Sequence, residues 1–331
     1  MIVVTGATGH VGNVLIRDLI SSGQAVRALV LPDDDLRPLA GLDVEIIYGD
    51  VTDLASLELA FTGADIVFHL AGIVTIMPGM EKVLQRVNVG GVRNVAAACR
   101  AAGVRRLVYT SSVHAIAEPP QGTAIDESQP FDPDRVLGDY ARSKARATLL
   151  LLEEVGKGGL DAVICCPTGI IGPGDYGISN MGQLILDFAS GHLKSYVSGG
   201  YDFVDVRDVT RGLSLAAAKG LKGRHYILSG AQVQVLELMK ELEKDIGHPA
   251  PTYRIPPAIA RAAGVLASAY YRLLRRRPVF TAYSIDVLRS NSQVSSARAR
   301  RELGFTSRPW QESIRDHVEW FRTQGILPGR G

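Results

Sequence analysis

The 331-residue chain has few cysteines and almost no excess charge, and each scarcity excludes a class of protein. Its three cysteines are too few and too irregularly spaced for a disulfide framework or a metal site; they are Cys99, Cys165 and Cys166. We therefore expect a reducing, cytoplasmic compartment and no bound metal. The formal net charge of +2 gives no reason to expect a nucleic acid or a strongly acidic partner.

The sequence also lacks an apolar run long enough to cross a membrane. Its most apolar segment, 258–274, is short, and its polar positions fall three or four apart, as on one stripe of a helix. We expect a packed helix there. The alternative is a contact with a membrane surface or an apolar entrance for the substrate. The chain begins directly with a strand pattern, so we expect no signal peptide.

Short β-branched runs alternate with amphipathic stretches through the first half of the chain. The expected strands cover 2–5, 25–31, 44–48, 66–70, 106–110 and 162–166. The expected helices between them include 12–22, 54–61 and 81–102. This alternation predicts an α/β fold with a doubly wound parallel sheet of the Rossmann type.

The pattern changes after Pro167. Segments 169–174 and 198–201 are typical of loops, 249–257 is rich in proline, and the last third is mainly helical, although 225–228 is typical of a strand that returns to the sheet. We predict a dinucleotide-binding domain over 1–168, to which 202–228 returns. A smaller, mostly helical and interleaved substrate-binding lobe is predicted over 169–331.

Three glycines, Gly6, Gly9 and Gly12, are spaced three apart where the first expected strand ends and the first helix begins. Gly6 permits a tight turn, Gly9 lets the backbone approach a pyrophosphate, and Gly12 allows the helix to pack closely on the strand. The start of the helix supplies N–H groups and a positive dipole. In this strand–turn–helix context, the motif predicts a dinucleotide site.

The end of the second strand decides between two cofactors, because an acid there holds the ribose of NAD and an arginine holds the 2′-phosphate of NADP. The strand ends at Leu31, which is neither. Three acids follow closely: Asp33, Asp34 and Asp35. They should repel a phosphate, whereas Arg27 and Arg37 could attract one, and a solvated loop without either role is the other interpretation. We predict that NAD(H) is preferred, with NADP(H) as the alternative.

Tyr140 and Lys144 lie four residues apart, and so on one face of a helix. A phenol ordinarily has a pKa of about 10, and a nearby ammonium group favours phenolate and lowers that pKa. The pair therefore predicts a proton donor or acceptor that works at neutral pH. The alternative is a solvent-facing pair without a catalytic role.

Thr110, Ser111 and Ser112 follow the fifth expected strand, at the carboxyl end where ligands of open α/β sheets bind. A serine hydroxyl there can hydrogen-bond a reacting carbonyl or alcohol and align it with Tyr140. The other interpretation is a serine that caps a helix or closes a turn.

Together these motifs resemble the extended short-chain dehydrogenase/reductase family, also called the NAD-dependent epimerase/dehydratase family. Over essentially the whole chain, the matching segments are TGATGHVG at 5–12, Asp50-Val51, HLAG at 69–72, Asn88-Val89, TSS at 110–112, Tyr140 with Lys144, Pro167-Thr168, GPG at 172–174, DVRDV at 205–209 and RELG at 301–304.

The resemblance implies a catalytic set of Ser112, rather than Ser111, with Tyr140 and Lys144. It implies that Asp50 and Val51 meet the adenine and that Lys144 also touches the nicotinamide ribose. The residues that it places along the cofactor are Gly6, Thr8, Gly9, His10, Val11, Gly12, Leu31, Asp50, Val51, Leu70, Ala71, Gly72, Thr110, Tyr140, Lys144, Pro167, Thr168 and Ile170.

Two departures from the family pattern narrow the range of possible substrates. Its sugar-nucleotide dehydratases carry two acids after the catalytic serine, where this chain has Val113 and His114 and so no carboxylates for β-elimination. Many of its epimerases grip the substrate diphosphate with an arginine, where this chain has Tyr201, and a neutral ring is a poor replacement against two negative charges. We expect an uncharged substrate, with His114 and Tyr201 as candidate contacts; a merely packed histidine is the alternative.

The branch that the chain most resembles contains dihydroflavonol reductases and 3β-hydroxysteroid dehydrogenases. It implies an NAD(P)-dependent oxidoreductase that interconverts a ketone and a secondary alcohol on a largely apolar, steroid- or flavonoid-like small molecule, with Tyr140 as general acid/base. A homodimer is also implied. The alternatives are a nucleotide-sugar 4-epimerase with tightly bound NAD and a non-catalytic NAD(P)-sensing regulator, the latter disfavoured because all three catalytic residues are present.

Overall fold

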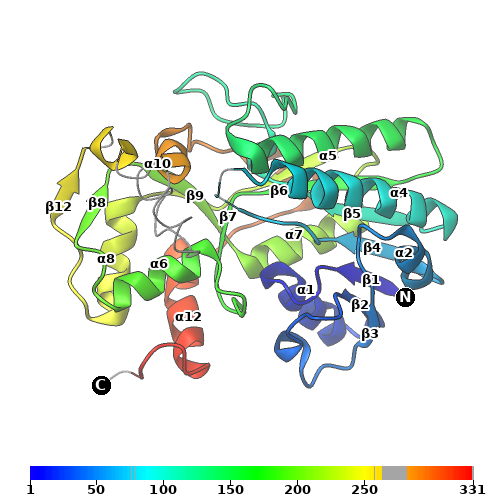
Figure 1. Ribbon diagram of the computed structural model, residues 1–331, viewed down its shortest axis with the longest axis horizontal. Helices are drawn as coiled ribbons and strands as arrows, with labels where there is room; N and C mark the ends of the chain where they lie inside the picture. The colour runs from blue at the N-terminus through cyan, green and yellow to red at the C-terminus, as the bar shows by residue number, and fades with distance from the viewer. Residues whose placement is uncertain (76, 78, 257, 263–281, 330–331) are drawn as a thin grey trace.

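The computed structural model describes residues 1–75, 77, 79–256, 258–262 and 282–329. A seven-stranded parallel sheet forms its larger part, in the order β10-β6-β5-β4-β1-β2-β3 (Figure 1). The strands are β1 (Ile2–Thr5), β2 (Val26–Val30), β3 (Glu45–Tyr48), β4 (Ile66–His69), β5 (Arg106–Thr110), β6 (Ala162–Pro167) and β10 (His225–Leu228). The order reverses between β1 and β4, which opens a crevice at the carboxyl ends of the strands. The predicted Rossmann-type sheet is confirmed.

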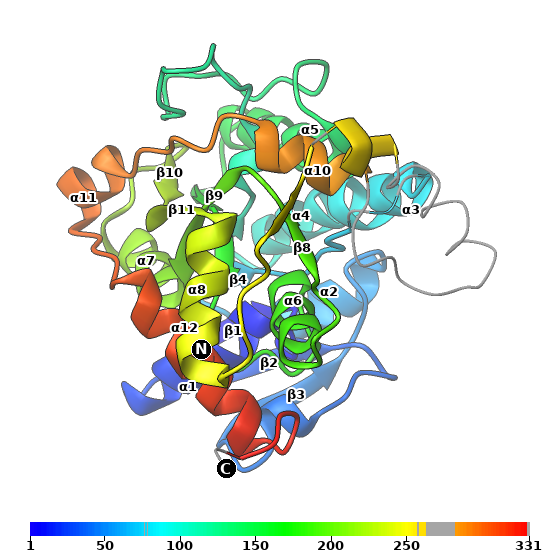
Figure 2. The same ribbon diagram turned by 90° about the vertical axis from the view of Figure 1, so that its left-hand side faces the viewer.

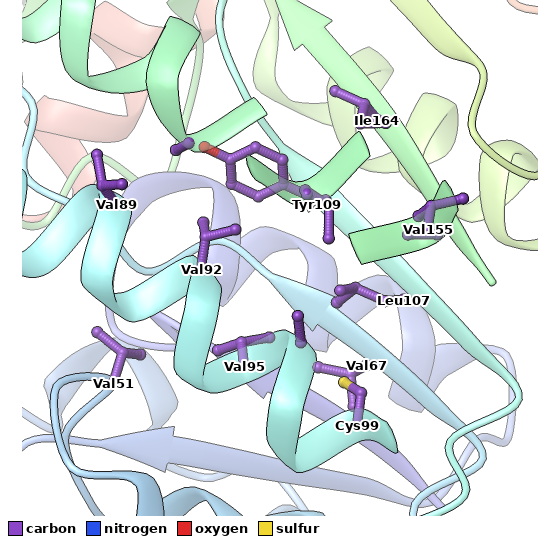
Figure 3. Close-up of a cluster of buried hydrophobic side chains, with 14 of the residues drawn as sticks. Val51, Val67, Val89, Val92, Val95, Cys99, Leu107, Tyr109, Val155 and Ile164 are labelled. Atoms are coloured by element: carbon purple, nitrogen blue, oxygen red, sulfur yellow. The ribbon is translucent and has the colours of Figure 1, made fainter. Parts of the chain in front are cut away.

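Helices cover both faces of this sheet (Figure 1). On one face lie α1 (His10–Ser21), α7 (Val206–Lys219) and α11 (Ala297–Leu303), and on the other α2 (Leu54–Phe61), α4 (Gly91–Ala101) and α5 (Gly138–Gly156). Two cores result because neighbouring strand residues point to opposite faces: Val3 enters one core and Val4 the other, both fully buried. Figure 3 shows Val92 and Val95 of α4 in the first of these cores, beside Leu107 of β5.

The single long helix predicted over 81–102 is interrupted in the structure. It begins as α3 (Glu81–Leu84), continues as the π-helical turn η2 (Gln85–Gly90) and ends as α4. The wider turn brings Gly91 against Val51, where a Cβ on the glycine would lie 2.9 Å from the valine Cγ2. Such turns are frequent at functional sites, and this one carries Asn88 inward.

The remainder forms a smaller lobe around its own apolar core. A three-stranded sheet in the order β11-β9-β7 contains β7 (Gly169–Ile171), β9 (Gly200–Asp205) and β11 (Ala231–Gln234), and β8 (Ser195–Val197) pairs with β12 (Tyr253–Ile255). Figure 2 shows the lobe helices α6 (Asn180–Ala189), α8 (Val235–Ile246) and α12 (Trp310–Thr323) together. The last described elements include α10 (Ala282–Arg289) and the C-terminal helix α12.

The loops predicted at 169–174 and 198–201 are therefore partly wrong. Gly169–Ile171 is a strand paired with β9, and Gly200 already belongs to β9. The proline-rich segment 249–257 likewise contains β12. These strands exist because they pair with segments far along the chain, which a local sequence pattern does not reveal.

The chain passes between the two parts more than once. After β9 in the lobe, α7 packs beside α1 and β10 pairs with β6 in the large sheet. We propose a domain boundary in which α7 and β10 belong to the dinucleotide domain and β9 to the lobe. Of the helix expected over 258–274, everything beyond residue 262 lies outside the described residues. Among the helices of the described residues, none is long and apolar enough to cross a bilayer.

Candidate active site and cofactor cleft

The glycine motif forms a turn that leaves no room for a side chain at Gly6 or Gly12. Gly6 has a φ of +68°, and a Cβ there would lie 2.7 Å from the backbone nitrogen of Ala71. A Cβ on Gly12 would lie 2.1 Å from the carbonyl oxygen of Gly6. Helix α1 thus rests against the turn, and its N-cap, Gly9, supplies no side chain to cap the first N–H groups. These features fit a dinucleotide pyrophosphate.

Among the three acids after β2, Asp34 is bonded to this turn. The hydroxyl of Thr8 donates to Oδ2 of Asp34 at 3.0 Å, and the same oxygen accepts the N–H of the exposed Leu31 at 3.0 Å. Asp35 instead pairs with Arg37 at 2.6 Å. The structure therefore places the Asp34 carboxylate beside the glycine motif. The sequence alone did not distinguish Asp34 from Asp33 and Asp35.

The second arginine considered for a phosphate is also engaged elsewhere. Arg27 pairs with Glu45 at 2.9 Å and donates to the carbonyl oxygens of Ala60 and Thr62. Its side chain is therefore committed to β3 and to the end of α2.

The other segments predicted to line the cofactor follow the carboxyl ends of β3 and β4. Oδ1 of Asp50 accepts the N–H of Thr52 at 2.8 Å, and Val51 is buried against Gly91. Beyond β4, Leu70 and Ala71 are half-buried, and Gly72 is exposed. A Cβ on Gly72 would lie 3.5 Å from the Lys144 ammonium, so this segment and the candidate catalytic lysine share one edge of the sheet.

His10, predicted beside the cofactor, has its side chain turned elsewhere. Its Nε2 donates to the carbonyl oxygens of Gly172 and Pro173 at 3.1 and 3.0 Å. The imidazole thus contacts the loop after β7, and its backbone at the start of α1 is what faces the glycine turn. The neighbouring Val11 packs partly into the core between α1 and the sheet.

The three candidate catalytic residues come together from β5 and α5. Lys144 is 5% exposed; its Nζ donates to the carbonyl oxygen of Thr110 at 2.8 Å and lies 5.0 Å from the centre of the Tyr109 ring. The Ser112 hydroxyl lies close enough to the Tyr140 hydroxyl to lower the pKa of the phenol. Burial of the lysine removes the alternative of a solvent-facing Tyr–Lys pair.

The pKa of Tyr140 differs from the expectation. Burial raises it to about 12, and the nearby Ser112 hydroxyl acts in the opposite direction. Burial also lowers the pKa of Lys144 to about 8. The Lys144 ammonium donates its hydrogen bond to the Thr110 carbonyl oxygen and not to Tyr140. Removal of the Tyr140 phenol from water therefore dominates the pKa of the phenol.

Ser111 and Ser112 point in different directions. The buried Ser111 hydroxyl lies 2.7 Å from that of Thr148, which itself donates to the carbonyl oxygen of Lys144. Ser111 therefore packs against α5, whereas the Ser112 hydroxyl lies near Tyr140 and lowers its pKa. Ser112 also accepts the N–H of His114 at 3.2 Å.

Asn88 is a residue of the site whose role the sequence did not reveal. From the π-helical turn, its amide exchanges two hydrogen bonds with the backbone of Ile73, at 2.8 and 3.1 Å. It also donates to Ser143 at 3.0 Å, and Ser143 donates to the carbonyl oxygen of Tyr140 at 2.7 Å. Asn88 thus ties the segment after β4 to the turn of α5 that carries Tyr140.

His114 and Tyr201 meet on the lobe side. Nε2 of His114 lies 2.6 Å from the Tyr201 hydroxyl, and burial lowers the pKa of His114 to about 4, so its ring is neutral. A Cβ on Gly169 would lie 2.6 Å from the tyrosine ring, so the absence of a side chain at residue 169 gives the ring its place.

A hollow beside this pair, called the His114 hollow below, is lined by Val113, His114, Glu118, Ile125, Thr168, Tyr201, Asp202, Ser290, Asn291, Ser292 and Val294. Burial raises the pKa of Asp202 to about 6, although the nearby Thr168 and the hydrogen bond from the N–H of Gly230 act in the opposite direction. Pro167 is buried, and Ile170 packs partly against the core beside α1. Within the described part of the chain, no group of three acidic, histidine or cysteine residues could hold a metal ion.

Comparisons with known proteins agree with this geometry. The model of the NAD dependent epimerase/dehydratase family matches residues 2–229. The chain is 38% identical to sterol demethylase protein B of Methylococcus capsulatus, with 98% of this chain and 99% of that protein covered. It is 31% identical to a Synechocystis protein whose name marks it as a candidate dihydroflavonol 4-reductase, with 98% and 95% covered.

A third relative, from Stigmatella aurantiaca, is a 4-hydroxy-2-methyl-3-oxo-4-farnesyl-3,4-dihydroquinoline-1-oxide ketoreductase, 30% identical with 99% of this chain and 98% of that protein covered. Among solved structures, gox2253 has a TM-score of 0.87 and 32% identity, with 99% of both chains covered. The fold is shared with the UDP-glucose 4-epimerase of Thermus thermophilus in complex with NAD. That structure has a TM-score of 0.77 and 24% identity, with 97% of this chain and 98% of that chain covered. This chain therefore belongs to the NAD-dependent epimerase/dehydratase family and is an NAD(P)-dependent oxidoreductase of the extended short-chain dehydrogenase/reductase type.

Proposed function

We propose that this protein interconverts a ketone and a secondary alcohol on a largely apolar, uncharged small molecule, with Tyr140 as the general acid/base. The observation that carries the proposal is the set of buried Ser112, half-buried Tyr140 and buried Lys144 near the carboxyl end of β5. It lies beside the loop Leu70–Gly72, which leads from β4 past the glycine turn. A nicotinamide cofactor, when bound, supplies or accepts the hydride.

The chain's own residues handle the substrate oxygen and its proton. In reduction, Ser112 orients the carbonyl oxygen and Tyr140 donates a proton to it from the phenol; in oxidation, Tyr140 takes the proton back. Lys144, held by the Thr110 carbonyl, supplies positive charge beside the reacting groups. Asn88 and Ser143 hold the carbonyl of Tyr140 and so fix the turn from which the phenol projects.

Three observations support an apolar and uncharged substrate. The residues that line the His114 hollow include neither lysine nor arginine, and Glu118 and Asp202 would repel an anion. Val74 and Leu137, 67% and 46% exposed, lie next to the cofactor segment and at the start of α5. The relatives are named for a sterol, a dihydroflavonol and a farnesylated quinoline oxide, which favours a bulky, steroid- or flavonoid-like molecule.

We propose NAD(H) as the preferred cofactor, because Asp34 is anchored beside the glycine turn while Arg27 and Arg37 are paired with other acids. A 2′-phosphate would bring about two negative charges toward that carboxylate. The family resemblance supports a homodimer, and three free, buried thiols suit a reducing cytoplasmic compartment. Contact with a membrane surface is not part of the proposal.

The second candidate function is a nucleotide-sugar 4-epimerase, since the fold is shared with such enzymes. Tyr201 stands against it, because a neutral side chain hydrogen-bonded to His114 offers no charge to a diphosphate. A non-catalytic sensor of NAD(P) is opposed by the complete catalytic set.

The test is turnover of a panel of steroid ketones and flavonoid ketones with NADH, alongside UDP-sugars. We expect reduction of apolar ketones, and in Tyr140→Phe a loss of kcat of about 100-fold or more with little change in the Kd for NADH. Full activity of Tyr140→Phe would refute the proposed role. Thermal stabilisation by a UDP-sugar alone would indicate the epimerase, and cofactor binding without turnover of any carbonyl would indicate the sensor.

A further inference from the structure

Two histidines from opposite ends of the chain hold the same residue, Gly172. His10, the first residue of α1, donates from Nε2 to the Gly172 carbonyl oxygen at 3.1 Å. Nδ1 of His317, on the C-terminal helix α12, accepts the N–H of Gly172 at 3.2 Å. Gly172 has a φ of +122°, which favours glycine, and a Cβ there would lie 3.1 Å from Val206. The peptide on each side of Gly172 is thus fixed by an imidazole.

The Asp175 carboxylate lies between the two imidazoles. Its Oδ1 lies 4.0 Å from Nδ1 of His10, and its Oδ2 lies 3.4 Å from Nε2 of His317. Ser179 adds hydrogen bonds to the carboxylate from its N–H and its hydroxyl. Asp175 and His317 are essentially without solvent contact. Burial acts to raise the pKa of Asp175, but His317, His10 and Ser179 outweigh it, and the pKa is lowered.

The partners define which ring nitrogens carry a hydrogen. A backbone N–H can only donate, so Nδ1 of His317 is an acceptor and its proton lies on Nε2, facing Asp175. Carbonyl oxygens can only accept, so Nε2 of His10 carries its hydrogen. Burial lowers the pKa of His10, which keeps the ring neutral. The loop after β7 is therefore bonded from both sides by imidazoles around one carboxylate.

The same loop is bonded to Asn13, in the first turn of α1. Nδ2 of Asn13 donates to the carbonyl oxygen of Gly174 at 2.9 Å and to that of Gly9 at 2.8 Å. With His10 on the Gly172 and Pro173 carbonyls, three successive carbonyls of the loop are tied to the start of α1. Gly9 is itself a member of the glycine motif. The side chain of Asn13 therefore bonds both this motif and the loop after β7.

We propose that His317 is a positioning residue for the cofactor. Through its hydrogen bond to Gly172 it holds the loop whose carbonyl oxygens accept from His10 and Asn13, and with them the start of α1 that faces the pyrophosphate. Cofactor affinity then depends on a side chain of the lobe helix α12 that belongs to none of the segments lining the cofactor. The inference goes beyond the proposed reaction, because it concerns how the substrate lobe holds the cofactor end of α1 in place.

The test measures the Kd for NADH by nicotinamide fluorescence, with the melting temperature of each variant recorded in parallel. His317→Phe keeps the ring volume and removes both polar atoms, and we expect its Kd to rise about tenfold. His317→Asn places an amide oxygen near the position of Nδ1 and should recover most of the affinity by accepting from Gly172. His317→Gln, which reaches toward Asp175 instead, should recover little.

The matched control is Val318→Ala, a buried neighbour on the same helix that packs into the lobe core. It should lower the melting temperature and leave the Kd for NADH unchanged. A lower melting temperature of His317→Phe with an unchanged Kd would overturn the proposal, as would an equal rise of the Kd in Val318→Ala. If His317→Phe does not fold, the comparison of His317→Asn with His317→Gln decides, and equal affinities would overturn it.

Discussion

The hydroxyl of Thr8, inside the glycine motif, donates a 3.0 Å hydrogen bond to Oδ2 of Asp34, beyond the end of β2. The same carboxylate oxygen accepts the N–H of Leu31, so the acid is held between the strand end and the turn. A carboxylate at this edge of a Rossmann sheet suits free ribose hydroxyls and opposes a 2′-phosphate. We therefore propose that Asp34 takes the place of the acid that stands at the strand end in other dinucleotide sites.

Replacement of this carboxylate should shift the cofactor preference. In Asp34→Asn, which keeps the shape and removes the charge, we expect the ratio of the Kd values for NADPH and NADH to fall about tenfold. Asp33→Asn is the matched control, because Asp33 is exposed and adjacent. Fluorescence titration of both cofactors on the three proteins measures the effect, and an equal shift in both variants would mean that overall charge, and not Asp34, sets the preference.

Arg37→Ala should leave the Kd for NADPH unchanged, because Arg37 is already paired with Asp35 at 2.6 Å. Titration of the variant with NADPH measures this. Tighter binding of NADPH than of NADH by the wild-type protein, lost in Arg37→Ala, would show that the arginine folds back to the ribose and that the preference is reversed.

The two directions of the reaction should differ in their pH dependence. Since burial raises the pKa of Tyr140 to about 12, the phenol is protonated at neutral pH. Oxidation needs the phenolate, so kcat/KM for an alcohol should rise about tenfold per pH unit between about pH 6 and pH 9. Reduction uses the protonated phenol and should stay flat up to about pH 8, above which Lys144 loses its charge because burial lowers its pKa to about 8. Initial rates in both directions measure this, and a flat oxidation profile would mean that another group takes the proton.

Gly12→Ala should be far more damaging than Gly9→Ala. A Cβ at residue 12 would lie 2.1 Å from the Gly6 carbonyl oxygen, whereas one at residue 9 would lie 3.2 Å from it. We expect the free energy of unfolding to fall by about 3 kcal/mol for Gly12→Ala and by about 1 kcal/mol for Gly9→Ala. Urea unfolding measures both, and equal losses would contradict the close packing of α1 on the turn.

Tyr201→Phe should weaken substrate binding. The change removes the hydroxyl that lies 2.6 Å from Nε2 of His114 in the His114 hollow. We expect kcat/KM for a reducible ketone to fall about tenfold, mainly through KM, because the contact serves binding in both ground and transition states. Steady-state kinetics measure it, with Tyr253→Phe on the exposed strand β12 as the control. Unchanged kinetics in Tyr201→Phe would remove this pair from the substrate contacts.

Local patterns were sufficient for the large sheet and for much of the candidate site. β-branched runs placed the strands of the Rossmann sheet to within a residue or two, and the strands inside the sheet need such residues because they are buried on both faces. The glycine motif was readable because its backbone leaves no room for a Cβ at Gly6 or Gly12. Tyr140 and Lys144 share a helix face by spacing alone.

Only the tertiary structure decided which partners these residues meet. The sequence could not show that Asp34 faces Thr8, that Asn88 lies in a π-helical turn, or that β7 pairs with β9. The imidazole of His10 bonds a carbonyl 162 residues away, and no local pattern encodes such a contact. Periodicity and backbone sterics act within a few residues, whereas the direction of a polar side chain depends on which distant donors and acceptors packing brings within reach. For the same reason the pKa of Tyr140, expected to fall from its spacing to Lys144, rises once burial is known.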